Sequence, residues 1–438
     1  MQYIVRTKNP IHTRAMNSLT KYAGGPETDT VFQDLTVRRF MNYARYWTTS
    51  ERHSKETPSS PGQWELAKAL MEELRSLGVN DLLLTEHCYL IGRLAASPGK
   101  ERHIPVGFLA HLDTSEEVSG RDVKPQLVEN YDGRAIKLGD GLCLDPALDP
   151  LLAAHKGKAL IHSDGSTLLG ADNKAGIAII MGAAEHLLKN PELSHGPIEL
   201  IFTPDEETGK GLPEFPIKDI QAKICYTLDG GPRGELEWEC FNAWSAEIKF
   251  TGIPMHLGQA RGRMVSAVLM ASLFAAMLPR NESPEATDGY YGYYCPLSIQ
   301  GDLENACLEV FIRDFDRQEG ARRLAALENF GRAIEAQFPG GKVEVSSRLQ
   351  YLNMKERISE SPEVLQKLRQ AYINTGVEIY EKPIRGGTDG SKLSELGIPT
   401  PNIFTGGRNF HSRLEWLSVP EMAAACRLLV ELIGLWGE

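Results

Sequence analysis

Apolar residues in the first 240 positions follow two patterns, helical spacing and short continuous runs. Helical spacing predicts a helix over 31–47 and a second from Trp64 that ends at Gly78. A long apolar stretch over 175–188 predicts a buried helix. Apolar runs bounded by turn residues predict strands at 82–85, 104–110, 168–170, 198–203 and 224–228. The strand–helix–strand order predicts an α/β layer with a mostly parallel central sheet.

The pattern changes near Phe241. Longer helical stretches over 264–278 and 318–337 alternate with strand candidates at 243–251 and 306–313, which predicts a smaller α+β unit. After about Tyr351 the α/β pattern returns, with a helix over 362–374 and a last helix that begins at the capping box Ser418-Val-Pro-Glu421.

These changes divide the chain into three parts. Residues 1–30 are predicted to be a loosely structured N-terminal extension that ends in the loop Gly24-Gly25-Pro26. Residues 31–240 and 352–438 form the α/β domain, which is interrupted by the α+β domain over 241–351.

Composition and charge narrow the class of protein. Hydrophobic residues make up 42% and charged residues 24% of 438 residues, as in an ordinary globular protein. The formal charge of −11 argues against nucleic acid or an anionic membrane as a partner. The longest apolar run, 264–278, is shorter than the roughly 20 residues of a membrane span. Seven scattered cysteines without a C-x-x-C pair, and an N-terminus without an apolar signal core, predict a cytoplasmic protein.

Acidic residues and histidines follow the predicted strands, where open α/β sheets place their ligand crevices. This mixed nitrogen and oxygen set, without thiolate, suits zinc or a similar first-row dication. Two metals that share one carboxylate would need about this many ligands. The residues are His111, Asp113, Asp172, Glu206, Glu207, Asp229 and, in a glycine-rich loop, His411.

Each of these residues also has an ordinary structural explanation. Asp172 could cap the following helix, Glu206 and Glu207 could be solvated loop charges, and His411 could be a structural histidine. Independent structural residues have no reason to collect at one edge of one sheet, so their joint placement favours a metal site.

Several segments carry a resemblance to a known family. They resemble, in order from about Phe32 to near the C-terminus, those of the co-catalytic zinc aminopeptidases of the M20 metallopeptidase clan, most closely the tripeptide aminopeptidases. The segments are His111-Leu-Asp113-Thr114, Gly170-Ala-Asp-Asn-Lys-Ala-Gly176, Pro204-Asp-Glu-Glu-Thr-Gly209, Leu228-Asp-Gly-Gly231, Arg313-Asp-Phe-Asp316, Arg385-Gly-Gly-Thr-Asp-Gly390 and Phe404-Thr-Gly-Gly407.

The resemblance implies a role for each residue of the set. It implies two Zn²⁺ per chain, with other divalent first-row metals as alternatives, and Asp172 bridging the two ions. Glu206 would be the general base, and Asp113 would orient His111. The implied fold is a zinc-binding α/β domain interrupted by a smaller lid, which commonly mediates dimerisation, so we expect a homodimer through the lid. The implied metal ligands are His111, Asp172, Glu207, Asp229 and His411.

Physical reasoning assigns similar roles. Adjacent glutamates in a strand-end loop cannot both point the same way, so one can bind metal while the other meets a bridging water. A carboxylate two residues beyond a ligand histidine lies on the same side of an extended chain and can accept its free N–H. A general base at Glu206 would take the proton of the water and pass it to the departing amine.

Three further residues are candidates for substrate binding. By the resemblance, His256 reaches the scissile carbonyl oxygen, sometimes from the partner's lid, although Leu257 stands where the family usually has proline. The alternative is a surface histidine in a turn. Arg313 and Arg385 suit a terminal carboxylate, because a guanidinium binds it in a bidentate fork; the alternative is two structural ion pairs. Asn173 stands where the tripeptide aminopeptidases have a second aspartate, but related clan members have other residues there, so the bridging role of Asp172 is unaffected.

The expected function is a dinuclear zinc aminopeptidase that releases the N-terminal residue of short peptides, with tripeptides as the expected substrate. One alternative is an amidohydrolase or dipeptidase of the same clan that acts on N-acyl amino acids or dipeptides. Another is a non-catalytic peptide-binding homologue, which the intact Glu206 argues against.

Overall fold

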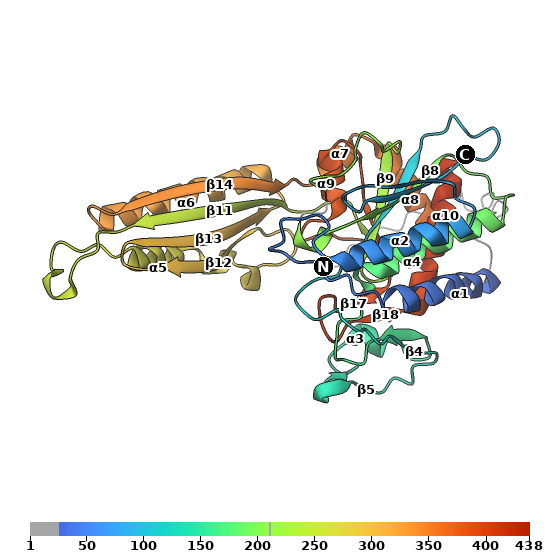
Figure 1. Cartoon of the computed structure of the whole chain (residues 1–438), viewed down its shortest axis with the longest axis horizontal. Coiled ribbons are helices and arrows are strands. Elements are labelled where there is room, and N and C mark those ends of the chain that lie inside the picture. Colours follow the sequence, from blue (N-terminus) through green and yellow to red (C-terminus); the bar gives the residue numbers. More distant parts are fainter. Residues whose placement is uncertain (1–25, 210–211) are drawn as a thin grey trace, which may run out of the picture. The chain divides into compact units, whose positions relative to one another are not determined.

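The computed structural model describes residues 26–209 and 212–438, which fall into two compact units (Figure 1). The first unit holds the described residues up to Leu236 together with Ser361–Glu381 and Pro401–Glu438. The second unit holds Glu237–Glu360 and Lys382–Thr400. Most of the predicted N-terminal extension lies outside the described residues. Helix α1 already begins at Pro26, so residues 26–30 are helical and not part of a loose lead-in.

The described part of the first unit is built on an eight-stranded sheet in the order β1-β2-β8-β3-β9-β16-β10-β15. Its centre is parallel, because β3 pairs in parallel with β8 and β9, and β9 with β16. Strands β1 and β2 are antiparallel at one edge. The predicted α/β class is confirmed. The strands are β1 (Asp81–Leu84), β2 (Leu90–Leu94), β3 (Val106–His111), β8 (Ile198–Thr203), β9 (Ile224–Gly230), β10 (Glu235–Glu237), β15 (Tyr380–Glu381) and β16 (Asn402–Phe404).

One predicted strand is wrong. Residues 168–170 form no strand and lead directly into helix α4 (Ala171–Lys189). The backbone N–H groups of Leu169 and Gly170 donate to the carboxylate of Glu415 instead of to a neighbouring strand. The run is apolar because Leu168 and Leu169 are buried, and burial does not require sheet pairing.

Helices cover the large sheet. Helix α4 packs against β3 and β9, and α1 (Pro26–Tyr43) and α10 (Val419–Trp436) pack against α4. Helix α8 (Pro362–Asn374) packs on α10, and α2 (Pro61–Ser76) on β1 and β2. The start of α10 was predicted from a capping box. One of its two hydrogen bonds is present, because the Ser418 hydroxyl accepts from Glu421 N at 3.3 Å. The Glu421 carboxylate instead pairs with Arg408.

A smaller sheet in the order β17-β18-β7-β4 completes the first unit. Its strands enclose a small core in which Trp416 is fully buried against Leu152 and Leu160. These elements are β4 (Gln126–Val128), β7 (Leu160–His162), β17 (Gly407–Arg408) and β18 (Trp416–Ser418), with the hairpin β5 (Ile136–Lys137) and β6 (Cys143–Leu144) and the short helix α3 (Pro150–Ala153) nearby.

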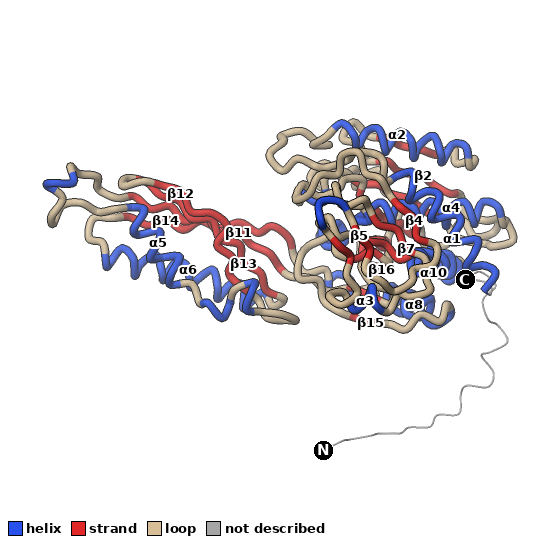
Figure 2. The backbone as a smooth tube through the Cα atoms, turned by 90° about the horizontal axis from the view of Figure 1, so that it is seen from below, coloured by secondary structure: helices blue, strands red, loops and turns tan. Residues whose placement is uncertain are grey.

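The second unit is an antiparallel sheet in the order β12-β13-β11-β14, with α5 and α6 on one face (Figure 2). Phe250, Phe274 and Leu327 are buried in the core between the helices and the sheet. Its elements are β11 (Asn242–Thr251), α5 (Ala267–Met277), β12 (Tyr293–Gly301), β13 (Asn305–Asp314), α6 (Arg317–Gln337), β14 (Lys342–Tyr351), α7 (Lys355–Ser359) and α9 (Asp389–Glu395). Strands β12 and β14 were not predicted.

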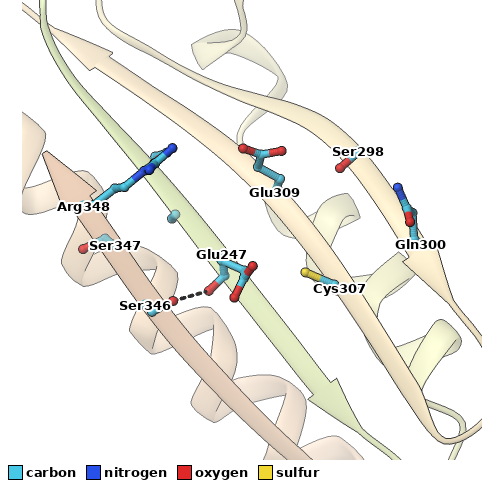
Figure 3. A pocket seen from close by; sticks show the side chains of 10 residues that line it. Glu247, Ser298, Gln300, Cys307, Glu309, Ser346, Ser347 and Arg348 are labelled. Atoms are coloured by element: carbon cyan, nitrogen blue, oxygen red, sulfur yellow. Dashed lines mark hydrogen bonds between the residues drawn. The ribbon is translucent and has the colours of Figure 1, made fainter. Parts of the chain in front are cut away.

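The opposite face of this sheet is open and polar. It carries a hollow of about 540 Å³ into which Glu247, Glu309 and Arg348 project (Figure 3). Among the described helices of the whole chain, none is long and apolar enough to cross a bilayer.

Candidate metal centre

His111 and Asp229 come to the same point from two neighbouring parallel strands. His111 is the last residue of β3 and is buried, and Asp229 lies near the end of β9. His111 Nε2 lies 2.9 Å from Oδ1 of Asp172 and 3.6 Å from Oδ1 of Asp229. These three side chains form a first group of convergent ligand atoms, which we call the His111 group.

His411 gathers a second group of the same kind. It lies in the loop between β17 and β18 with a left-handed backbone, φ 58°. His411 Nε2 lies 3.0 Å from Oε2 of Glu207 and 3.2 Å from Oδ2 of Asp172. We call His411, Glu207 and Asp172 the His411 group. The five predicted metal ligands therefore all converge, in two groups that share Asp172.

Asp172 presents a different oxygen to each histidine, as a carboxylate that bridges two cations would. It lies two residues after Gly170, whose φ of 80° starts the sharp turn into α4, and its own backbone is not helical. The cap of this turn is Asn173, whose Oδ1 accepts from Gly176 N at 3.2 Å. Asp172 is thus not the helix cap, and Asn173 performs that role without adding a charge beside the bridge.

The electrostatics of the two groups fit bound cations. Burial, reinforced by the charge of Asp172, raises the pKa of Glu207 to about 8 and that of Asp229 to about 6. Burial also opposes ionisation of Asp172, but hydrogen bonds with His111 and His411 outweigh it and hold that pKa well below its usual range. In the described chain, Glu207 Oε1 is buried without a hydrogen-bond partner. A dication would compensate the crowded charge and satisfy this oxygen, so the residues present fit a metal.

Asp113 connects His111 to the loop of the two glutamates. His111 Nδ1 lies 3.1 Å from the backbone carbonyl of Asp113 and 3.2 Å from its Oδ1, which leaves Nε2 directed at Asp172. The same carboxylate accepts from the backbone N–H groups of Glu206 at 3.0 Å and Glu207 at 3.1 Å. The His-x-Asp spacing indicated the contact with His111. The contact with the glutamate loop gave no sequence signal, because it joins segments far apart in the chain.

The glutamate loop is also held from its other side, by Asp205. Asp205 is fully buried with a φ of 56°, and it accepts from Ser59 N and from Gln63 Nε2, each at 2.7 Å. This acidic residue is thus an anchor of the loop to the start of α2. Of the pair that follows, Glu207 turns into the His411 group, with Oε2 3.0 Å from His411 Nε2. The assignment of Glu207 as a ligand and Glu206 as the base stays a prediction.

Sequence reasoning missed Glu117, whose Oε2 lies 3.4 Å from His411 Nδ1. It faces His411 as Asp113 faces His111. A carboxylate two residues from its histidine can be found by spacing, whereas Glu117 and His411 are brought together only by the fold.

The three predicted substrate-binding residues belong to the second unit. His256 precedes the short 3-10 turn Leu257–Gln259 in the loop between β11 and α5. Arg313, buried at the end of β13, donates from Nη1 to the carbonyls of Trp244 and Ile312. Its guanidinium also lies over the rings of Phe311 and Tyr351.

Arg385 uses both terminal nitrogens within its own unit. Nη1 donates to the carbonyls of Gly289 and Tyr291, and Nη2 to the carbonyl and hydroxyl of Thr287. Both arginines therefore contact carbonyls, a hydroxyl or aromatic rings of the described chain, rather than the carboxylates of the alternative explanation.

Comparisons with known proteins agree with this geometry. Residues 159–434 match the model of peptidase family M20/M25/M40. Peptidase T of Geobacillus sp. (strain WCH70) is 46% identical over 403 residues, covering 91% of this chain and 98% of that protein. Peptidase T of Clostridium perfringens (strain SM101) is 44% identical over 401 residues, with the same coverage.

Two solved structures have a similar fold. Aminopeptidase PepT from Bacillus cereus aligns over 93% of this chain and 99% of its own, with a TM-score of 0.73 and 23% identity. YXEP of Bacillus subtilis, described as a dinuclear metal-binding peptidase, aligns over 92% of this chain and 98% of its own, with a TM-score of 0.62 and 14% identity.

Proposed function

As a member of peptidase family M20/M25/M40, this chain is a metallopeptidase, and we propose that it is an aminopeptidase that removes the N-terminal residue from tripeptides. The observation that carries the proposal is the division of Asp172 between two histidines, 2.9 Å from His111 and 3.2 Å from His411. One carboxylate thereby serves two groups of ligands, an arrangement that suits hydrolysis with two metal ions.

The residues of the two groups would hold two divalent ions, which we propose to be zinc. When bound, the ions would polarise the scissile carbonyl and lower the pKa of a water molecule between them. The His111 group would hold one ion and the His411 group the other, with Asp172 common to both.

We assign the proton transfer to Glu206. The oxygen of the water forms a bond to the carbonyl carbon, the C–N bond breaks, and Glu206 carries the proton of the water to the departing amine nitrogen. Asp113 supports this role because its carboxylate fixes the backbone of Glu206 at 3.0 Å. His256 would meet the scissile carbonyl oxygen.

Substrate length would be set at the far end of the peptide. We assign the terminal carboxylate to Arg313 rather than Arg385, because both terminal nitrogens of Arg385 already donate to the chain, whereas the two carbonyl bonds of Arg313 both come from Nη1. A free ammonium near the acidic groups at one end and a guanidinium at the other would admit one chain length. Dipeptides would not reach the guanidinium, and tetrapeptides would crowd it.

We also propose a homodimer formed through the second unit. Helix α5 exposes Val268, Leu269 and Leu273, and the edge strand β12, which α5 contacts, exposes Leu297 and Ile299. An apolar strip beside an open strand edge suits a second copy of the same surface. A cytoplasmic location is proposed on the seven cysteines, which all lie in the described ranges as free thiols.

A peptide panel tests the function. Di-, tri- and tetrapeptides would be supplied with free, N-acetylated or C-amidated ends, and metal content would be measured on the same sample. We expect two divalent ions per chain. Free tripeptides should exceed tetrapeptides and amidated tripeptides by at least about tenfold in kcat/KM, which is about 1.4 kcal/mol.

The outcomes separate the alternatives. Preference for N-acylated substrates would favour an amidohydrolase, and metal binding without any turnover would favour a peptide-binding homologue. Arg313→Met should remove most of the tripeptide preference and leave the metals bound. Arg385→Met is its matched control, and should leave the preference in place.

A further inference from the structure

A buried carboxylate that belongs to neither ligand group holds the backbone next to the bridging residue. Glu415 is 2% exposed. Its Oε2 accepts from Leu169 N at 2.7 Å and Gly170 N at 2.8 Å, and its Oε1 accepts from Asp172 N at 3.2 Å. One side chain therefore satisfies three backbone donors within four consecutive residues.

These three donors need such a partner. The segment 168–170 forms no strand, and Gly170 turns the chain with a φ of 80°. Buried N–H groups that are paired neither in a sheet nor within a helix carry a large desolvation cost. A carboxylate can accept all three, so Glu415 determines the path of the chain into Asp172. Burial raises the pKa of Glu415 to about 7, and its hydrogen bonds with backbone N–H groups oppose that rise.

Glu415 and His411 lie in the same loop between β17 and β18. The far end of this loop is fixed, because Trp416 pairs with His162 of β7 and donates from Nε1 to Asp149 at 2.9 Å. The loop therefore supplies one ligand directly, His411, and holds the backbone of a second, Asp172. The span from His411 to Glu415 sets where these two ligands meet.

The two groups do not depend on this loop equally. His111 and Asp229 lie on β3 and β9, which pair with each other in the central sheet. His411 is a loop residue with a φ of 58° and lies outside the described strands. Without the Glu415 contacts the loop would no longer be held to the backbone of Asp172, so two of the three ligands of the His411 group, His411 and Asp172, would lose their fixed relation. The His111 group would keep His111 and Asp229 in place on the sheet, with Asp172 as the one displaced ligand.

We propose that Glu415 is a positioning residue that fixes Asp172 relative to His411, and that it controls the affinity of the ion in the His411 group more than that of the ion in the His111 group. The inference rests on the proposed two-ion site. Partners in the outer shell of a metal site typically change affinity by about 10–100-fold when they are replaced.

Glu415→Gln tests the inference, because an amide presents an NH₂ donor in place of one acceptor and cannot accept all three N–H groups. Glu199→Gln is the matched control. Glu199 is also 2% exposed and accepts from the backbone of Gln221 and Ala222, at 2.9 Å and 2.8 Å, but lies on β8 away from both groups. The full-length apoprotein of each variant would be titrated with Zn²⁺ against a chromophoric chelator, and thermal unfolding measured with and without metal.

We expect Glu415→Gln to raise one of the two zinc dissociation constants by about 10–100-fold, and so to weaken binding of that ion, and to leave the other constant nearly unchanged. Glu199→Gln should lower the unfolding temperature of the apoprotein but keep both constants. If Glu415→Gln does not fold, Glu415→Asp, which keeps the charge with a shorter reach, should give a smaller loss at the same ion.

Three results would overturn the inference. Unchanged zinc dissociation constants in Glu415→Gln would show that Glu415 has no positioning role. An equal rise in both constants would show that its role is a general structural one. An unmutated protein that binds only one ion would overturn the two-ion function, and this inference with it.

Discussion

The carboxylate of Asp113 accepts a hydrogen bond from the backbone N–H of Glu207 at 3.1 Å, so a residue of the His111 side holds a ligand of the His411 side. The same carboxylate lies 3.2 Å from His111 Nδ1. The His411 group therefore depends on a residue that also contacts His111. The two groups are coupled through Asp113 as well as through the shared Asp172.

Asp113→Asn should impair both metal binding and turnover. The amide removes the anion beside His111 and presents a donor to an N–H of the glutamate loop, so we expect zinc affinity to fall by about 10–100-fold. Asp205→Asn is the control, because Asp205 anchors the same loop without touching His111. Titration of the apoproteins with zinc measures the effect. If the two variants behave alike, Asp113 acts only on the loop.

Replacing each of the two adjacent glutamates by glutamine, in separate variants, should distinguish their roles. Glu206→Gln should lower kcat by about a hundredfold or more and leave metal content unchanged, because a general base typically contributes about 10²–10⁴ in rate. Glu207→Gln should lose metal, since Glu207 Oε2 lies 3.0 Å from His411 Nε2. Turnover and elemental analysis on the same preparations measure both effects. Equal metal loss in the two variants would contradict the assignment.

A charge on α5 should dissociate the dimer. Leu269 is 49% exposed on α5, so Leu269→Glu would place a carboxylate in the proposed interface, which we expect to yield monomers at micromolar concentration. Leu148→Glu is the control, because Leu148 is 84% exposed in the first unit and should not affect assembly. Sedimentation velocity distinguishes the species. A monomeric parent protein would contradict the proposed dimer.

Acid should destabilise the metal-free protein through two buried histidines. Burial lowers the pKa of His155 and of His162 below the ordinary value. In the unfolded chain both bind protons at higher pH than in the folded chain, so stability is lost as pH falls through about 6.5. Buried carboxyl groups with a raised pKa, such as Glu207, act in the opposite direction, so the effect is measured as a difference from the parent. Relative to the parent, the Tm of the variant His155→Gln/His162→Gln should rise as the pH is lowered from 7.5 to 5.5.

Thermal unfolding in EDTA measures this slope without bound metal. His53→Gln, at an exposed position, is the control and should keep the slope of the parent. Parallel curves for the parent and the double variant would show that His155 and His162 do not carry the acid sensitivity.

The sequence alone determined the elements whose signals are local. Strands β3 and β8 are buried along their whole length, and β9 is buried except at Asp229. Each is a mostly apolar run that ends at, or just before, candidate ligand residues. Strand β14 gave no such run, because none of its residues is buried and its place in the sheet depends on pairing with β11. Strand β2 was missed as well, since Gly92 and Arg93 interrupt its short apolar run.

Residue type and position after predicted strands were enough to single out the candidate residues, because a metal site needs particular donors and Asp113 lies two residues from His111. The family resemblance supplied the division into ligands and base. Only the tertiary structure decided which oxygen of Asp172 faces which histidine, and that Glu117 faces His411. The contact between Asp172 and Glu415 joins residues 243 positions apart. Such a contact depends on how distant segments pack against one another, and the local pattern of apolar and polar residues carries no information about that packing.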